Sequence, residues 1–361
     1  MQLPRIVIAG NGQLGQMLQQ AGAPLQLEVQ PIHPIGDQLV ELNDDDVISV
    51  EIEHWPENPV GNQLKSHPNF RNDAALYQVI DRFRQKSTLD RLNVPTAPWV
   101  DLNSADASSA DASIAESLSS LGERAVVKAR MGGYDGRGQW RWKQGDEILA
   151  EWDGIAIAEA MIPFSHEVSL VGARNAQGEK VFYPLTRNWH QDGILRASIP
   201  GLDNDPAMQA SAEGWLGSIM DDFDYIGVMA MECFVVDGEL LVNELAPRVH
   251  NSGHWSQEGA SVSQFELHLR ALAGLPLITP EFRGVSMMYN LLGRDWKAEW
   301  LAVQGAHVHW YGKEIRPGRK VGHLNIVRPT VSALVESLSE LEPHLDEGEA
   351  VVVEWAKAQL S

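Results

Sequence analysis

The chain opens with a short apolar strand that runs directly into a glycine-rich turn, and this feature constrains its fold most. Residues 5–9 read RIVIA, and residues 10–15 read GNGQLG. An apolar strand, a tight glycine turn and a helix, here through about Gly22, are the opening of a parallel α/β unit. The next elements are predicted as strands at 25–29 and 46–52 and a helix at about 72–92.

The glycine turn by itself favours a monophosphate site over a dinucleotide site. Backbone amides at a helix N-terminus hold a phosphate with favourable dipole alignment. A dinucleotide site also needs an acid at the end of the second strand, for the ribose hydroxyls. That end reads Gln30-Pro31, and Glu28 falls inside the predicted strand. We therefore set nicotinamide binding aside and keep two interpretations, a monophosphate-binding turn and a purely structural turn.

The composition describes a globular chain that repels polyanions. With 361 residues, 44% hydrophobic and 21% charged, it is long enough for two or three packed domains. A formal charge of −21 argues against nucleic acid or an anionic membrane surface as a partner. No stretch is apolar for long enough to span a membrane, and a single cysteine, Cys233, excludes an internal disulfide framework. We expect a cytoplasmic protein.

The middle of the chain changes character twice. A Ser/Ala/Asp-rich stretch at 101–123 predicts an exposed helix behind a loose loop, with no assigned chemistry. From 125 to 181, short β-rich runs separated by Gly, Asp and Asn predict an antiparallel lobe. The later elements are predicted as a helix at 206–223, strands at 228–236, 239–246, 307–311 and 321–327, and a closing helix and strand.

A lysine beside a glycine-rich loop suggests a polyphosphate site. Lys128 ends an apolar run, and GGYDGRG follows at 132–138. A strand-end ammonium and mobile backbone amides can surround phosphates while the loop closes over them. A flexible hairpin with an exposed lysine is the alternative. Glu159 and Glu167 recur where a nucleotide's base and ribose need hydrogen-bond acceptors.

Two glutamates on neighbouring strands give the strongest local signal. Glu232 and Glu244 lie on predicted strands joined around Asp237-Gly238. Two carboxylates suit Mg²⁺, which takes few protein ligands and fills its other positions with water and phosphate oxygens. A strict two-residue turn would pair Glu232 with Asn243 and send Glu244 to the opposite face. The metal hypothesis therefore predicts a three-residue loop or a bulge, which places the two acids opposite each other.

Five motifs together resemble a known family. They are NGQLG at 11–15, GGYDGRG at 132–138, HQDGILR at 190–196, NELAPRVHNSGHW at 243–255 and RPGRKVGHLN at 316–325. In this order they are similar to the N5-carboxyaminoimidazole ribonucleotide synthetases of purine biosynthesis, which are ATP-grasp enzymes. The resemblance implies an α/β and α+β architecture. Its expected parts are a Rossmann-like domain at 1–85, an ATP-grasp domain at 86–276 with a flexible lobe at about 125–187, and a small β-rich domain at 277–361.

The resemblance also implies site residues. Magnesium ligands would be Glu232 and Glu244. The nucleotide, ATP, would be held by Arg82, Lys128, Gly133, Tyr134, Asp135, Gly136, Arg137, Gly138, Gln139, Glu159, Ala160, Met161, Ile162, Glu167, His190, Asn243 and Glu244. The pocket where bicarbonate meets the aminoimidazole would be lined by Tyr134, Arg137, Arg248, His250, Asn251 and Lys320, with either Glu51 or Glu53. Arg248 suits a planar anion because its guanidinium donates two parallel hydrogen bonds.

Four cations within eight residues stand out in this acidic chain: Lys313, Arg316, Arg319 and Lys320. We expect the 5′-phosphate of the ribonucleotide between this cluster and the amides of Gly12, Gln13, Leu14 and Gly15, and a solvated loop is the alternative. By resemblance, bicarbonate attacks the γ-phosphate of ATP, and the amine of aminoimidazole ribonucleotide captures the carboxyl group. Free carbon dioxide and direct transfer from carboxyphosphate both stay open, and so do a formate-using ATP-grasp transformylase and a non-catalytic nucleotide sensor. The resemblance implies a homodimer.

Overall fold

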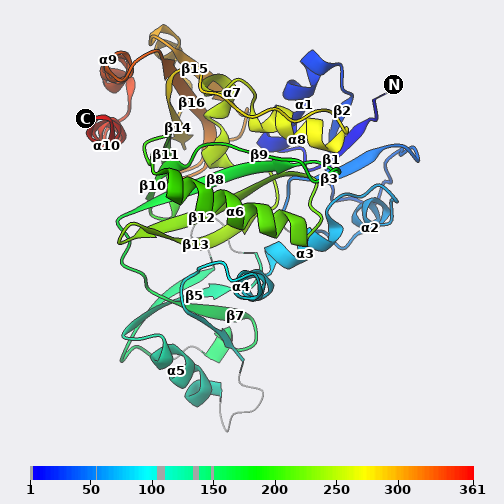
Figure 1. Ribbon diagram of the computed structural model, residues 1–361, viewed down its shortest axis with the longest axis vertical. Coiled ribbons are helices and arrows are strands. Elements are labelled where there is room, and N and C mark those ends of the chain that lie inside the picture. The colour runs from blue at the N-terminus through cyan, green and yellow to red at the C-terminus, as the bar shows by residue number, and fades with distance from the viewer. Residues whose placement is uncertain (1–2, 54, 104–109, 133–137, 148–149) are drawn as a thin grey trace.

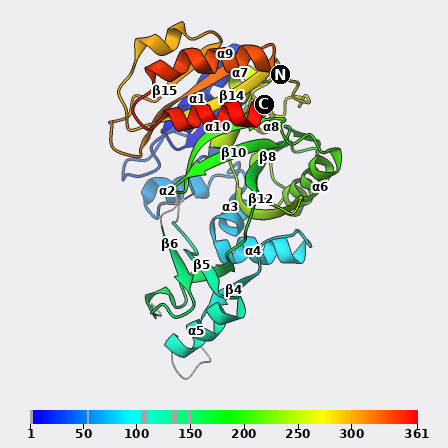
Figure 2. The same ribbon diagram turned by 90° about the vertical axis from the view of Figure 1, so that its left-hand side faces the viewer.

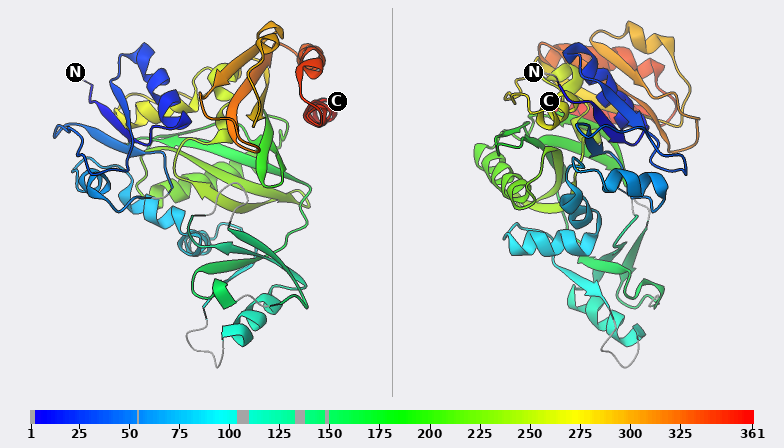
Figure 3. Two further views of the ribbon diagram at one scale, coloured as in Figure 1. Left: turned by 180° about the vertical axis from the view of Figure 1, so that it is seen from behind. Right: turned by 90° about the vertical axis from the view of Figure 1, so that its right-hand side faces the viewer.

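Three β-sheets organise the part of the chain that this computed structural model describes, residues 3–53, 55–103, 110–132, 138–147 and 150–361. Figure 1 shows a small lobe that carries β5, β7 and α5 and projects away from the rest of the molecule. The N-terminal sheet and the C-terminal helices lie at the other end, on opposite sides (Figures 1 and 3). The large sheet lies between them.

The first sheet is parallel, with the order β2-β1-β3, which confirms the predicted α/β opening. Its elements are β1 (Ile6–Ala9), α1 (Gln13–Gly22), β2 (Val29–Ile32), β3 (Val47–Val50) and α2 (Pro59–Lys65). The strand predicted at 25–29 is wrong, because a 3₁₀ turn at Ala23–Leu25 with Pro24 in its first turn delays the strand to Val29. Glu28 therefore precedes the strand, and His33 follows its end. No acid stands at the end of β2, where a dinucleotide site needs one for the ribose hydroxyls.

The helix predicted at about 72–92 is two helices, α3 (Asp73–Ile80) and α4 (Arg82–Arg91). Asp81 separates them in an extended conformation, with φ −90° and ψ 111°. Its side chain accepts a hydrogen bond from the Phe83 amide at 2.9 Å. An aspartate is a preferred N-cap, so the break comes from the start of α4.

The projecting lobe is a four-stranded antiparallel sheet with the order β4-β7-β5-β6. Its elements are β4 (Trp99–Leu102), α5 (Ala110–Ser120), β5 (Arg124–Ala129), β6 (Gln139–Lys143) and β7 (Ala156–Ala160). The predicted antiparallel lobe and the helix within 101–123 are confirmed. The extension of the lobe to 181 is wrong, because β8 (His166–Arg174) and β9 (Lys180–Phe182) join the large sheet. Residues 168–174 are all buried, as befits an inner strand covered on both faces.

The large sheet has nine strands, with the order β13-β12-β8-β10-β11-β14-β16-β15 and β9 paired to β8. The strands not yet given are β10 (Thr186–Gln191), β11 (Ile194–Pro200), β12 (Gly227–Val236), β13 (Glu239–Ala246), β14 (Val285–Leu292), β15 (Ala306–Trp310) and β16 (Lys320–Arg328). Strand β11 pairs with β14, so one sheet continues from the central part of the chain into its C-terminal part. The domain limits 1–85, 86–276 and 277–361 remain predictions.

Helices cover this sheet on several sides: α6 (Pro206–Asp222), α7 (Ser256–Gly259), α8 (Gln264–Leu272), α9 (Val331–Leu341) and α10 (Ala350–Leu360). Figure 2 shows α9 and α10 next to each other at the end of the molecule away from the lobe. The closing strand predicted from the valine run is wrong. Val352, Val353 and Ala356 are buried at helical spacing against Leu338 and its neighbours. No described helix combines the length and apolar character needed to cross a bilayer.

Candidate active site at the junction of the sheets

Glu232 and Glu244 lie directly opposite each other on β12 and β13. The turn at Asp237-Gly238 has two residues with φ of 51° and 85°, as a tight hairpin requires. The register shifts between Glu232 and Cys233, and this bulge brings Glu244 to the face of Glu232. Of the two predicted arrangements, a three-residue loop or a bulge, the structure has the bulge, and the predicted pairing of the two acids is confirmed.

The charge of Glu232 is poorly compensated within the chain. Burial, and then the Glu244 carboxylate, raise the pKa of Glu232 to about 7, although His190 and Lys320 act in the opposite direction. His250 Nε2 lies 3.3 Å from Glu232 Oε1. Burial and the charge of Arg248 hold the pKa of His250 well below its usual value, so the imidazole is neutral and brings no positive charge to Glu232.

The donor chemistry fits magnesium. Within the described residues, no group of three or more His, Cys, Asp or Glu side chains is arranged to hold a metal ion. Mg²⁺ is commonly held by one or two carboxylates plus phosphate oxygens and water. Glu232 and Glu244 provide the two carboxylates. Arg82 Nη2 donates to Glu244 Oε2 at 3.2 Å, so a guanidinium also lies beside the acid pair.

Lys128 lies across from the acid pair, at the place where the lobe meets the large sheet. Its Nζ donates to Glu159 Oε2 at 3.0 Å and to Asn243 Oδ1 at 3.1 Å. Glu159, predicted as an acceptor for the nucleotide, is only 3% exposed, and its carboxylate is engaged by Lys128. Lys86 Nζ lies 3.5 Å from the same oxygen. Sequence patterns missed Lys86 because a lysine in a polar helix gives no sign that it is buried.

The segment after Glu159 presents few free backbone donors. The amide of Ala160 donates to Pro98 O at 2.8 Å, and that of Met161 donates to Arg124 O at 3.2 Å. The Met161 side chain is exposed, and Ile162 is half-buried. Backbone donation to a nucleotide base from residues 160 and 161 would therefore need these bonds to be exchanged.

Glu167 and His190 form a pair on neighbouring strands of the large sheet. His190 Nδ1 lies 2.7 Å from Glu167 Oε2. Burial lowers the pKa of His190, but the bond to Glu167 and the charge of Glu232 outweigh it and raise the pKa. The structure thus brings Glu167 and His190 close to Glu232, one of the opposed acids.

The glycine loop is only partly described. Gly133, Tyr134, Asp135, Gly136 and Arg137 lie outside the described residues. Gly138 immediately precedes β6, and Gln139 begins that strand opposite Lys128. The end of the loop is therefore anchored beside the predicted phosphate-binding lysine.

Glu51 and Glu53 follow β3 and turn to different partners. Glu53 Oε1 accepts a hydrogen bond from Arg248 Nη2, and Arg248 Nη1 donates to Val249 O at 2.9 Å. Burial lowers the pKa of Arg248, but Glu53, and then Glu51, more than offset that effect and raise it. Arg248 lies among acids, so Glu53 already occupies one end of the guanidinium fork predicted for bicarbonate.

Glu51 lies on the glycine turn where the sequence predicted a phosphate. A Cβ atom on Gly10 would come within 2.4 Å of Glu51 Cγ, so this glycine makes room for the side chain. Burial raises the pKa of Glu51 to about 7, while the amides of Gly15 and Gly12 and the charge of Arg248 act in the opposite direction. The 5′-phosphate was predicted at the amides of Gly12, Gln13, Leu14 and Gly15. In the structure the Glu51 carboxylate faces two of them, the amides of Gly12 and Gly15.

The structure divides the predicted cation cluster. Lys313 Nζ donates to Gln13 Oε1, which ties the loop to the start of α1. Arg316 is exposed and pairs with Glu314 at 2.5 Å, and Arg319 Nη1 donates to Glu314 O at 3.3 Å. Lys320 instead begins β16, where its charge reaches Glu232, His190 and His250. Lys320 belongs with the acid pair, whereas Arg316 pairs with the Glu314 carboxylate and Arg319 with the Glu314 backbone carbonyl.

Behind these groups lies a polar network that sequence patterns did not reveal. Ser169 Oγ donates to Ser252 Oγ at 2.7 Å and accepts from Asn188 Nδ2 at 2.9 Å. Ser252 Oγ lies 2.8 Å from His250 Nδ1, which fixes the ring beside Glu232. Asn251 exchanges hydrogen bonds with Asn290 at 2.7 and 3.1 Å. In the sequence, the only indication of this network is the presence of small polar residues, such as Ser169 and Asn290, within otherwise apolar strands.

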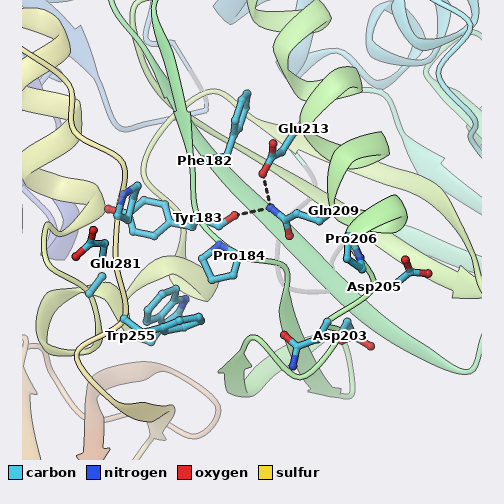
Figure 4. Close-up of a pocket in the computed structure, with 14 residues that line it drawn as sticks. Phe182, Tyr183, Pro184, Asp203, Asp205, Pro206, Gln209, Glu213, Trp255 and Glu281 are labelled. Carbon is cyan, nitrogen blue, oxygen red and sulfur yellow. Dashed lines mark hydrogen bonds between the residues drawn. The ribbon is translucent and has the colours of Figure 1, made fainter.

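A separate cavity of about 360 Å³ lies between the start of α6 and the segment around Trp255 (Figure 4). Several of its polar side chains already have protein partners. Gln209 bonds to Tyr183 O and to Glu213, and Asp203 pairs with Arg187 and His166. None of the acids or lysines of the sheet junction, such as Glu232, Glu244 and Lys128, lines this cavity. It is distinct from the site at the sheet junction.

A lysine on a small antiparallel sheet that faces paired acids on a larger sheet places the chain among the ATP-grasp proteins. The ATP-grasp domain model matches residues 87–265, and the phosphoribosylaminoimidazole carboxylase C-terminal domain model matches residues 286–337. An N5-carboxyaminoimidazole ribonucleotide synthase from Escherichia coli (strain K12) is 49% identical over 359 residues, 99% of each chain.

Solved structures indicate the same family as these sequence comparisons. The N5-carboxyaminoimidazole ribonucleotide synthetase from Thermus thermophilus superposes with a TM-score of 0.82 at 38% identity, over 95% of this chain and 99% of that one. A synthetase from Staphylococcus aureus complexed with ADP gives a TM-score of 0.77 at 27% identity, over 99% of this chain and 97% of that one. The chain belongs to the N5-carboxyaminoimidazole ribonucleotide synthase family, which confirms the resemblance seen in its sequence motifs.

Proposed function

We propose that this chain carboxylates 5-aminoimidazole ribonucleotide with ATP and bicarbonate, in purine biosynthesis, and that Glu232 and Glu244 hold the magnesium that the reaction uses. The observation that carries the proposal is the bulge that sets these acids opposite each other. When bound there, Mg²⁺ would offset the negative charge of the phosphate oxygens. Close relatives named for the same activity, and one complexed with ADP, support the assignment.

The nucleotide phosphates would meet Lys128 and Arg82, which approach the acid pair from the lobe and from α4. Phosphoryl transfer depends on positioning and charge neutralisation, so cations beside the phosphates, together with a metal ion at the acids, are what the chemistry requires. Both cations are held in place by acceptors, Lys128 by Glu159 and Asn243 and Arg82 by Glu244. The Glu167–His190 pair would contact the nucleotide from the large sheet.

Bicarbonate and the aminoimidazole would meet beside Arg248, His250 and Lys320. Arg248 supplies a fixed positive charge, and the neutral His250 imidazole accepts or donates a hydrogen bond without adding charge. Attack of a bicarbonate oxygen on the γ-phosphorus releases ADP and forms carboxyphosphate. The amine nitrogen then bonds to the carboxyl carbon and loses a proton, and phosphate leaves either beforehand, with release of carbon dioxide, or in the same step. Asn251 and Glu53 would orient the substrates beside these groups.

Further parts of the proposal come from the resemblance. Tyr134 and Arg137 would join the site when the glycine loop closes, and the last carboxyl transfer would proceed either through free carbon dioxide or directly. We also propose that the chain works as a cytoplasmic homodimer, without nucleic acid or membrane as partners. The charge of −21 and the single cysteine are consistent with that setting.

Release of ADP tests the activity most simply. We expect release that requires magnesium, bicarbonate and aminoimidazole ribonucleotide together, so that omitting any one of them stops it. Release that ignores the ribonucleotide would point to another ATP-grasp ligase, such as a formate-using transformylase. No release at all would point to a nucleotide-binding protein without turnover.

A further inference from the structure

Lys86 is a buried lysine whose place in the fold suggests a role in the nucleotide site. It lies on α4 and is 1% exposed. Its ammonium donates to Thr96 Oγ1 at 2.6 Å and to Asn243 O at 3.2 Å, and lies 3.5 Å from Glu159 Oε2. All three donors of the ammonium thus have an acceptor, which a buried ammonium requires.

The two lysines of this junction share the same acceptors. Lys128 donates to Glu159 Oε2 and to the side chain of Asn243, while Lys86 approaches the same Glu159 oxygen and the backbone carbonyl of Asn243. Glu159 belongs to the lobe sheet and Asn243 to the large sheet, next to the metal acid Glu244. One carboxylate therefore balances two ammonium groups at the point where the sheets meet.

We infer that Lys86 is a positioning residue for ATP binding, which holds Glu159 and Asn243 and thereby leaves Lys128 available to the nucleotide phosphates. If Lys128 were the only partner of Glu159, its move to a phosphate would leave a buried carboxylate without a counter-charge, which is costly. With Lys86 in place, Glu159 stays compensated when Lys128 turns away. The inference rests on the proposed assignment of Lys128 to the nucleotide.

The electrostatics of the junction agree with this arrangement. Burial raises the pKa of Glu159, but Lys128, and then Lys86, more than offset it and hold the pKa below its usual value. Burial, together with the charge of Lys128, lowers the pKa of Lys86 to about 8, against the attraction of Glu159. Glu159 thus remains ionised at neutral pH, and a share of that stabilisation comes from Lys86.

The test is Lys86→Met, which keeps the length of the side chain and removes its charge. We expect the KM for ATP to rise at least about tenfold, with a smaller fall in kcat and with the KM for aminoimidazole ribonucleotide within about twofold of wild type. Lys180→Met is the matched control, since its ammonium pairs with Asp221 on α6, away from the site. We expect its kinetics to equal those of wild type.

A double-mutant cycle separates positioning from general destabilisation. In a Glu159→Gln background there is no buried carboxylate for Lys86 to balance, so adding Lys86→Met should change the KM for ATP by no more than about threefold. An equal KM ratio in both backgrounds, or an unchanged KM in Lys86→Met, would overturn the inference. If Lys86→Met fails to fold, as shown by its melting curve, Lys86→Gln undergoes the same cycle.

Lys128→Met distinguishes this inference from the assignment beneath it. An unchanged KM for ATP in Lys128→Met would remove the proposed phosphate contact itself. A raised KM in Lys128→Met with an unchanged KM in Lys86→Met would remove only the role of Lys86.

Discussion

Two carboxylates of this site, the buried Glu159 and the half-buried Glu232, have pKa values shifted in opposite directions. Glu159, at the lobe junction, lies between Lys128 and Lys86, and its pKa is held below the usual value. Glu232, on the large sheet, has a neutral imidazole as its contact and a second carboxylate opposite, and its pKa is raised to about 7. Burial acts in the same direction on both, so the neighbouring charges decide the difference.

Glu159 thus has its counter-charges within the chain, whereas Glu232 and Glu244 lack full counter-charges and are suited to bind a cation. Glu159 is balanced by the chain itself, so it can remain buried and charged in the absence of any ligand. Among the described residues, Arg82, His190 and Lys320 offset part of the negative charge of Glu232 and Glu244. A site of this kind attracts an external cation, and the opposed acids fix where that cation would bind.

The largest expected effect comes from neutralising the acid pair. Glu244→Gln or Glu232→Gln should lower kcat by at least about 100-fold, as when one electrostatic stabiliser of a transition state is removed. Each variant should also lose the rise in melting temperature that magnesium and ADP give to the wild type. Glu239→Gln, on the exposed start of β13, is the control. If both site variants kept the magnesium-dependent stabilisation, Glu232 and Glu244 would not be metal ligands, and they would not differ from Glu159 in this respect.

A second prediction concerns the divided cation cluster. Lys320→Ala should raise the KM for aminoimidazole ribonucleotide by about 10-fold or more, because its ammonium lies among the site residues. Arg316→Ala should change that KM by less than about twofold, because Arg316 faces Glu314 and solvent. Steady-state kinetics of both variants decide the matter. Equal and large effects would restore the whole cluster as a phosphate site, and no effect in either would make it a solvated loop.

A third prediction extends the comparison to Glu51, whose pKa is raised to about 7 from an ordinary 4.5. Between these values the folded chain binds more protons than the unfolded chain, so this carboxyl lowers stability as pH rises through the window and has no further effect above it. Glu51→Gln should therefore gain stability relative to wild type between pH 5 and 7, by up to about 3 kcal/mol. Urea unfolding at several pH values measures the difference. A difference that is constant with pH would contradict the burial of this charge.

The smallest effect is expected in the cavity of Figure 4. Gln209→Ala removes bonds to Tyr183 O and Glu213 at the edge of that cavity. We expect a stability loss of about 1 kcal/mol and kinetics within about twofold of wild type. A large change in the KM of any substrate would show that the cavity communicates with the sheet junction.

Much of the fold could be predicted because local patterns carried it. The N-terminal strand and glycine turn, α6 and the β12–β13 hairpin each follow from periodicity and turn residues close together in the sequence. The membership of β8 in the large sheet depends on partners more than fifty residues away, such as β12, and no local pattern reports that. The closing valine run folds as a helix because its buried face matches α9.

The site shows the same division. The bulge at Glu232 could be stated from the sequence as one of two arrangements. Regular strand alternation would place Glu232 and Glu244 on opposite faces, and a shared metal site needs them on the same face. The placement of Glu51 on the glycine turn and of Lys86 between Thr96 and Glu159 could not, because each depends on how separate sheets meet. A polar side chain in sequence gives no measure of its burial.

A crystal grown with a non-hydrolysable ATP analogue and Mn²⁺ in place of Mg²⁺, with anomalous scattering to locate the metal, would show whether the acid pair binds the cation. We expect a metal peak bound by both Glu232 and Glu244, at roughly the 2.0–2.1 Å typical of magnesium or slightly longer. We also expect phosphates between that peak and Lys128. A peak elsewhere, with the space between these three side chains empty, would contradict the metal site at the acid pair.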